Sequence, residues 1–184
     1  MMGWNEMMGW NEMIVVVMGV SGSGKTTVGS LLAQRLGWPF YDGDDFHPPA
    51  NVDKMSRGIP LTDADREGWL AALAALIQKE LAQDQSAVLA CSALKRTYRD
   101  RLDVDREAVR FVYLKGNYDL ILARMQHRTG HYMHPDMLTS QFAALEEPGD
   151  VLTIEIDQPP EQMVDQIING LALPPAGSKG SDLV

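Results

Sequence analysis

The sequence predicts an α/β fold in which a five-stranded parallel sheet carries helices on both faces. Three observations lead to this prediction. Five short apolar segments recur along the chain, segments with helical spacing separate them, and no linker-like stretch divides the chain between residues 13 and 172. Parallel strands that are buried on both faces appear as continuous apolar runs rather than as alternating ones. We therefore expect a single three-layer α/β/α domain over residues 13–172.

The elements follow in a regular order. The expected strands are residues 14–18, 38–42, 87–91, 109–114 and 151–156. The expected helices are residues 25–36, 51–57, 63–83, 94–102, 117–128, 136–146 and 160–171. Gly37 ends the first helix in the usual way, and Thr62 is a good N-cap for the longest one.

The loop after the first strand carries the strongest motif. Residues 19–26 match G-x-x-x-x-G-K-S/T at every fixed position, between a predicted strand and a predicted helix. In such a P-loop, backbone N–H groups and the helix N-terminus surround nucleotide phosphates, the lysine reaches the terminal phosphates and the hydroxyl of Thr26 binds Mg²⁺. The residues expected to hold ATP here are Gly19, Val20, Ser21, Gly22, Ser23, Gly24, Lys25, Thr26 and Thr27. The motif thus predicts a P-loop NTPase fold.

Acidic residues follow the second strand. Asp42 and Asp44 are expected at the carboxyl edge of the sheet, where open α/β sheets bind ligands. Asp42 can hold the water shell of Mg²⁺, and Asp44 can accept the proton of an attacking hydroxyl. The alternative is an acidic turn without a chemical role, and for Asp45 we favour that alternative.

Phosphoryl transfer also requires positive charge around the moving group. Arg124 and Arg128 lie four residues apart on one helical face, before a predicted mobile lid at about residues 124–136. Lys95 and Arg96 follow the third strand at the same sheet edge, and Arg57 follows the short helix. These three residues are candidates for binding an anionic acceptor, and solvated surface cations are the alternative.

Composition excludes several functions. The formal net charge of the 184 residues is -9, which disfavours nucleic acid, single-stranded included, and anionic lipid as partners. No apolar run reaches the length of a membrane span, and the single cysteine fits a reducing compartment, so we expect a cytoplasmic protein. Residues 1–12 repeat one hexamer and are set aside, and residues 173–184 have the composition of a flexible tail. GTPase and motor signatures are absent from the sequence, which favours a small kinase.

Several segments resemble gluconokinases over about residues 14–171. They include Asp42-Gly-Asp44 with His47-Pro48, Gly58-Ile-Pro-Leu61, Asp65-Arg66, Cys91-Ser-Ala-Leu-Lys95 and Leu145-Glu-Glu-Pro148. The resemblance implies ATP-dependent phosphorylation of D-gluconate to 6-phospho-D-gluconate, and a fold similar to nucleoside monophosphate and shikimate kinases. It also implies a lid, and members are often homodimers.

The resemblance also implies roles for individual residues. Asp44 is the expected base, Arg124 and Arg128 cover the phosphates, and Gln158 with Pro159 borders adenine. The residues implied in gluconate binding are Asp44, His47, Arg57, Lys95, Arg96, His131 and Gln141. Asp45 adds an acid where the family often has another residue type, so the choice of base among Asp42, Asp44 and Asp45 stays open.

Two other functions stay open at this point. The first is a kinase for another small anionic metabolite, such as shikimate. The second is a regulatory module that binds nucleotide without turnover, although Lys25, Thr26 and Asp44 are all present.

Overall fold

The sheet is parallel throughout, with the strand order β2-β3-β1-β4-β5. The computed structural model describes residues 11–127 and 135–174. The strands are β1 (Ile14–Met18), β2 (Phe40–Asp42), β3 (Ala87–Ala90), β4 (Val109–Lys115) and β5 (Leu152–Glu155). The predicted five-stranded parallel sheet is therefore confirmed. The strand β1 lies between β3 and β4, so the chain crosses over on both sides of it.

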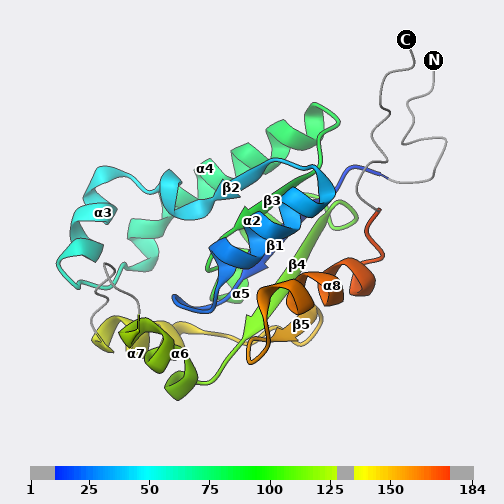
Figure 1. Cartoon of the computed structure of the whole chain (residues 1–184). Helices are drawn as coiled ribbons and strands as arrows, with labels where there is room; N and C mark the ends of the chain where they lie inside the picture. The colour runs from blue at the N-terminus through cyan, green and yellow to red at the C-terminus, as the bar shows by residue number, and fades with distance from the viewer. Residues whose placement is uncertain (1–10, 128–134, 175–184) are drawn as a thin grey trace, which may run out of the picture.

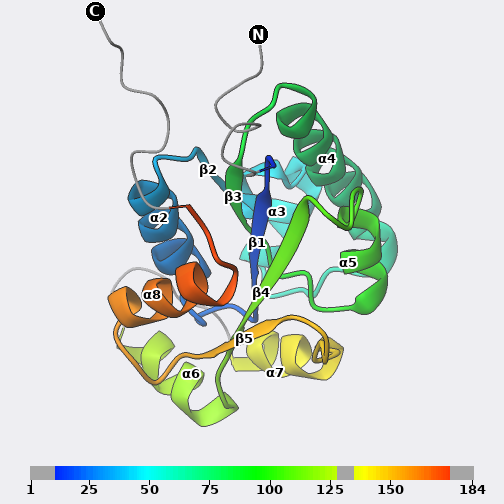
Figure 2. The same ribbon diagram turned by 90° about the vertical axis from the view of Figure 1, so that its right-hand side faces the viewer.

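Helices cover both faces of the sheet. They are α2 (Lys25–Leu36), α3 (Pro49–Ser56), α4 (Asp63–Ala82), α5 (Arg96–Leu102), α6 (Tyr118–Gln126), α7 (Pro135–Ala144) and α8 (Pro160–Gly170). The helices α2 and α8 lie on one side of the strands, and α4 and α5 lie on the other (Figure 2). The predicted three-layer arrangement is thus confirmed.

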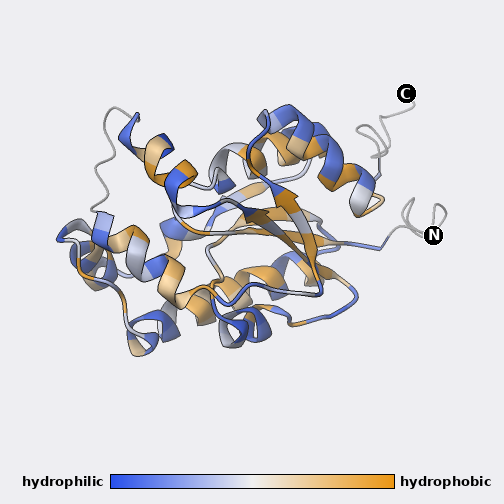
Figure 3. Cartoon of the chain, turned by 90° about the horizontal axis from the view of Figure 1, so that it is seen from below, coloured by the Kyte–Doolittle hydropathy of each residue, from blue (hydrophilic) through white to orange (hydrophobic). Residues whose placement is uncertain are grey.

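Alternate side chains of β1 pack into two different hydrophobic clusters, one on each face of the sheet. Val15 and Val17 pack with α2 and α8, whereas Ile14, Val16 and Met18 pack with α4 and α5. All five are at most 1% exposed, which explains why the strand is apolar without alternation. In Figure 3 the strands and the inner helix faces are hydrophobic, and the outer helix faces are largely hydrophilic.

Local signals fix the ends of the longest helix. Thr62 and Asp65 form a reciprocal capping box at the start of α4: the Thr62 hydroxyl accepts from the Asp65 N–H, and the Asp65 carboxylate accepts from the Thr62 N–H. Gly37 ends α2 with a positive φ of 69°. Both caps were predicted from the sequence.

An acidic turn after β2 was the alternative considered for Asp42 and Asp44, but its helical conformation was not predicted. Gly43–Phe46 form a short 3₁₀ helix, η1, because one oxygen of the Asp42 carboxylate accepts the N–H of Asp44. A second difference concerns α5, which begins at Arg96 rather than near Leu94. Ala93 has a positive φ of 44°, which breaks the helical run before that point.

The loops that follow β1, β2 and β3 meet at one edge of the sheet, because parallel strands end on the same side. The helices α3, α6 and α7 gather at one end of the molecule (Figure 1). Most of the predicted lid, most of residues 1–12 and most of the predicted tail lie outside the described residues. None of the helices in the described part of the chain is both long and apolar enough to span a bilayer.

Candidate active site

The P-loop has the conformation of a phosphate-binding turn. Gly22 and Gly24 take positive φ values of 79° and 96°, which only glycine adopts at little cost. A Cβ on Gly22 would come within 2.8 Å of the Met125 side chain on α6, so this position has no room for a larger residue. Gly24 is the N-cap of α2, which directs the positive end of that helix at the turn. Lys25 donates from Nζ to the carbonyl of Val20 at 3.0 Å.

A cavity of about 460 Å³ lies beside the P-loop between α2, α6 and α8. Thr27, Arg124 and Gln158 line it, as the sequence-based prediction of a nucleotide site requires. Pro160 lines the cavity, whereas the predicted Pro159 is the N-cap of α8. Arg124 donates a hydrogen bond to the carbonyl of Ile156, which holds its guanidinium at the cavity wall.

Two oxygen ligands meet beside the P-loop. The Thr26 hydroxyl donates to Oδ2 of Asp42 at 3.0 Å, and Oδ1 of Asp42 accepts the Asp44 N–H at 3.0 Å. A hydroxyl and a carboxylate next to a phosphate-binding turn suit Mg²⁺, which prefers oxygen ligands and keeps several waters. The predicted pair of metal ligands therefore lies together, and its chemistry fits that ion.

A smaller cavity of about 200 Å³, which we call the acceptor cavity because of the role predicted for Asp44, lies beside the P-loop at Ser21 and Lys25. Asp44 lines it together with Lys25, His47, Arg66 and Gln141. The cavity walls remove solvent from Asp44 and thereby raise the pKa of its carboxyl. The positive charge of Lys25 opposes this shift, and the charges of Asp42 and Asp45 add to it. A raised pKa makes Asp44 a stronger proton acceptor than an ordinary aspartate.

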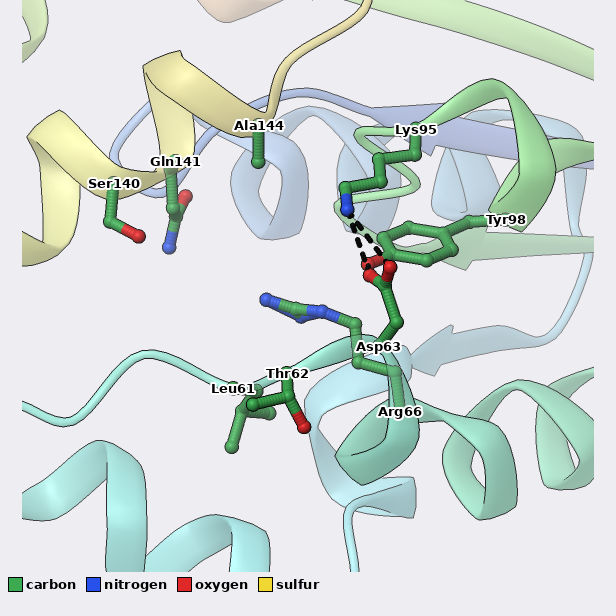
Figure 4. Close-up of a pocket in the computed structure, with 9 residues that line it drawn as sticks. All are labelled: Leu61, Thr62, Asp63, Arg66, Lys95, Tyr98, Ser140, Gln141 and Ala144. Carbon is green, nitrogen blue, oxygen red and sulfur yellow. Dashed lines mark hydrogen bonds and ion pairs between the residues drawn. The ribbon is translucent and has the colours of Figure 1, made fainter.

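A third hollow, of about 180 Å³, adjoins this acceptor cavity and shares Leu61, Arg66, Ser140 and Gln141 with it. Figure 4 shows Lys95 turned toward Asp63, whose carboxylate accepts from Lys95 Nζ at 2.8 and 3.1 Å. Tyr98 also donates its hydroxyl to Asp63. The hydrogen bond from Lys95 is the main cause that holds the pKa of Asp63 below its usual value. Lys95 thus lies in the region predicted, but it is already paired.

Arg66 is the cation that the sequence analysis assigned no role. Its guanidinium extends from α4 into the space between Leu61 and Gln141 (Figure 4) and lines both hollows. The Nε atom of Arg66 is buried and has no hydrogen-bond partner among the residues that the structure describes. The side chain is half-buried, and its guanidinium lies 5.6 Å from the centre of the Tyr98 ring. A buried donor that lacks a hydrogen bond is costly unless a ligand satisfies it. The only sequence signal was its place in the Asp65-Arg66 segment of the resemblance.

Gln141 forms a reciprocal pair with the P-loop. Its Oε1 accepts the Ser21 N–H at 2.7 Å, and its Nε2 donates to the Ser21 hydroxyl at 2.8 Å. Gln141 was predicted to bind substrate, and the structure places it between the P-loop and the acceptor cavity. The element that follows the predicted lid is therefore bonded directly to the phosphate-binding turn.

Other predicted residues lie elsewhere. Arg57 pairs with Asp53 at 2.7 Å and is exposed, and it is not among the residues that line the acceptor cavity. Arg96 lines a separate surface groove beside Glu146, whose carboxylate accepts the Arg96 N–H at 2.8 Å. The first N–H group of α5 is therefore already bonded to a carboxylate of this chain. Arg128 and His131 lie outside the described residues.

Comparison with known proteins agrees with this geometry. A family model for shikimate kinase matches residues 21–172. The gluconokinase of Gluconobacter oxydans (strain 621H) is 47% identical over 157 residues, which cover 84% of this chain and 88% of that protein. The chain belongs to the gluconokinase family.

Solved structures of similar proteins support the gluconokinase assignment. A gluconokinase from Sinorhizobium meliloti 1021 is 44% identical with a TM-score of 0.79, covering 87% of this chain and 91% of that one. An unliganded sugar kinase from Janibacter sp. HTCC2649 is also 44% identical, with a TM-score of 0.82 over 88% and 95% of the two chains. The structural similarity therefore extends over most of this gluconokinase chain.

Asp42→Asn tests the metal pair. We expect ATP affinity to fall about tenfold or more when Mg²⁺ is present and to change little in excess chelator, because the carboxylate acts through the ion. Isothermal titration calorimetry with and without Mg²⁺ measures this. Asp45→Asn is the matched control, since it removes a neighbouring acid outside the pair. Equal loss of affinity in both conditions would show that Asp42 acts only by shaping the turn.

Proposed function

We propose that this protein transfers the γ-phosphoryl group of ATP to the 6-hydroxyl of D-gluconate, which gives 6-phospho-D-gluconate and ADP. Membership in the gluconokinase family supports this function. The observation that carries it is the orphaned, buried Nε of Arg66 in the same cavity as Asp44. A base and an unsatisfied cation in one cavity suit a substrate that has a hydroxyl at one end and a carboxylate at the other.

Each part of the site has a role in this reaction. The P-loop N–H groups and Lys25 bind the phosphates, and Arg124 borders the nucleotide cavity. Thr26 and Asp42 hold Mg²⁺, which neutralises charge that develops on the phosphates. Asp44 accepts the proton of the gluconate hydroxyl as its oxygen attacks phosphorus, and the carboxylate of gluconate pairs with Arg66. Arg128 and His131 keep their predicted roles in covering the phosphates and binding gluconate.

The proposal also covers the cellular compartment, the oligomeric state and the partners of the protein. We expect the reaction in the cytoplasm, which the lone buried Cys91 supports. A homodimer remains an expectation of the family resemblance. No nucleic-acid or membrane partner is expected for a chain with a net charge of -9.

The decisive experiment measures ADP release from Mg·ATP with D-gluconate, D-glucose or shikimate as the acceptor. We expect turnover with gluconate only. Glucose has the same terminal hydroxyl but lacks the carboxylate, so it reports on the role of the negative charge. Turnover with shikimate instead would favour the alternative acid kinase. Nucleotide binding without turnover on any acid would favour the regulatory module.

Arg66→Gln tests the acid receptor. We expect the KM for gluconate to rise about 10- to 100-fold, with the KM for ATP nearly unchanged, because a charge-assisted hydrogen bond is lost. Steady-state kinetics with each substrate varied in turn measure this. Arg57→Gln is the comparison, since it removes an exposed cation that pairs with Asp53. A rise in the gluconate KM for Arg57→Gln alone would move the acid pocket to α3.

Asp44→Asn tests the base. We expect kcat to fall about 10²- to 10⁴-fold with the fold intact, because the amide cannot accept the proton. In the unmodified enzyme the raised pKa of Asp44 predicts that activity is lost, as pH falls, at a higher pH than for an ordinary aspartate. The pH profile of kcat/KM measures this limb. Asp45→Asn should keep turnover near normal and move this limb only slightly to lower pH, because the charge of Asp45 is a minor cause of the raised pKa of Asp44. Near-normal turnover of Asp44→Asn would exclude Asp44 as the base.

A further inference from the structure

The ring of His47 is held in a fixed plane at the wall of the acceptor cavity. It stacks on the indole of Trp69, with ring centroids 4.4 Å apart and an angle of 12° between the planes. Trp69 is buried and donates its indole N–H to the carbonyl of Gly43 at 2.7 Å. Gly43 begins the turn that carries Asp44, so Trp69 contacts both the imidazole of His47 and the turn of the proposed base.

Asn51 approaches the same ring from α3. This side chain is only 3% exposed, and its Nδ2 donates to the main-chain carbonyl of Asp65 at 2.8 Å. A carbonyl oxygen can only accept, so this bond fixes which end of the Asn51 amide is nitrogen. The same nitrogen lies 3.4 Å from Nδ1 of His47, and its second hydrogen is available for that atom.

The carbonyl of Asp65 is itself fixed in place. The Asp65 carboxylate accepts from Lys54 Nζ at 2.9 and 2.8 Å and from the Thr62 N–H at 2.9 Å. These bonds join α3 to the first turn of α4, and the Lys54 bond is the main cause that lowers the pKa of Asp65 to about 2. The carbonyl that accepts from Asn51 therefore belongs to a helix turn that is itself bonded to α3.

A donor facing Nδ1 determines the tautomer of a neutral histidine. If Nδ1 accepts a hydrogen bond, the proton must be on Nε2. The ring is neutral because burial and the nearby charge of Arg66 lower the pKa of His47 to about 4. The other charged side chains that line the cavity are Lys25 and Asp44.

We propose that Asn51 is a positioning residue that holds His47 as the Nε2–H tautomer, so that His47 donates a hydrogen bond to a hydroxyl oxygen of the acceptor. The identity of this acceptor as a polyhydroxy acid rests on the proposed function. A neutral donor cannot take the proton of the reacting hydroxyl, so Asp44 alone acts as the base. The site then favours a substrate with an oxygen that can accept a hydrogen bond at the position facing His47.

The tautomer can be read without any substrate. The test is ¹⁵N NMR of the imidazole of His47 in the full chain at neutral pH, assigned with His47→Gln. We expect the Nε2–H pattern in the unmodified protein. In Asn51→Asp the new carboxylate accepts from the ring, so we expect the proton on Nδ1 or on both nitrogens. An Nδ1–H or fully charged ring in the unmodified protein would overturn the proposal.

Kinetics test the substrate contact. The amide nitrogen of Gln reaches about as far as Nε2 of histidine, whereas that of Asn reaches only about as far as Nδ1. We expect His47→Gln to keep the gluconate KM within about threefold and His47→Asn to raise it about tenfold or more, with the KM for ATP unchanged in both. These two variants leave Asn51 intact, so they are informative even if Asn51→Asp does not fold. Equal gluconate KM values for both variants would exclude Nε2 as the donor.

A double-mutant cycle separates positioning from a merely structural role. Asn51→Asp should raise the gluconate KM about tenfold when His47 is present and less than about twofold in the His47→Gln background, which has no tautomer to set. Similar losses in both backgrounds would show that Asn51 acts only through stability. If no variant or parent phosphorylates gluconate, the proposed function fails, while the NMR result still decides the tautomer.

Discussion

The position of β1 at the centre of a parallel sheet is the constraint on which the rest of the site depends. It pairs with β3 on one side and β4 on the other, and β2 follows beyond β3. Because all strands run in one direction, the P-loop, the Asp42 turn and the loop after β3 leave the same edge. The candidate nucleotide cavity is lined at this edge by Gly22 and Gly24, and the acceptor cavity by Ser21 and Lys25. The strand order therefore determines which loops meet at the site.

The side chain of Asp42 joins the P-loop to the turn after β2. One carboxylate oxygen accepts from the hydroxyl of Thr26 on α2, and the other accepts from the N–H of Asp44. A single side chain thus joins Thr26, the proposed metal ligand of the P-loop, to the turn that carries Asp44, the proposed base. The indole of Trp69 supports the same turn from α4 through the carbonyl of Gly43. The base is therefore positioned from two helices, one on each face of the sheet.

The regular parts of this fold could be predicted from the sequence because their signals are local. The apolar run of β1, the P-loop glycines and the capping box of α4 each specify a conformation within a few residues. Lys95 shows where such reasoning ends. It is correctly placed after β3, but its ion pair with Asp63 joins residues 32 positions apart, and no local pattern predicts that pairing. The role of Arg66 was missed because a basic residue in the first turn of a helix usually faces solvent.

The contrast between these two cations bears on how an acid is recognised. The Lys95–Asp63 pair is partly exposed, with side-chain exposures of 31% and 65%. Solvent screens such a pair, so an incoming carboxylate can displace Asp63 at small cost. Arg66 requires no displacement, because its buried Nε has no partner among the described residues. In the proposed reaction this buried donor gains a partner only when the acid binds, so Arg66 supplies binding energy at the carboxylate end of the acid, away from the reacting hydroxyl. In a protein with a net charge of -9, the buried Nε of Arg66 supports the proposed preference of the site for an anion.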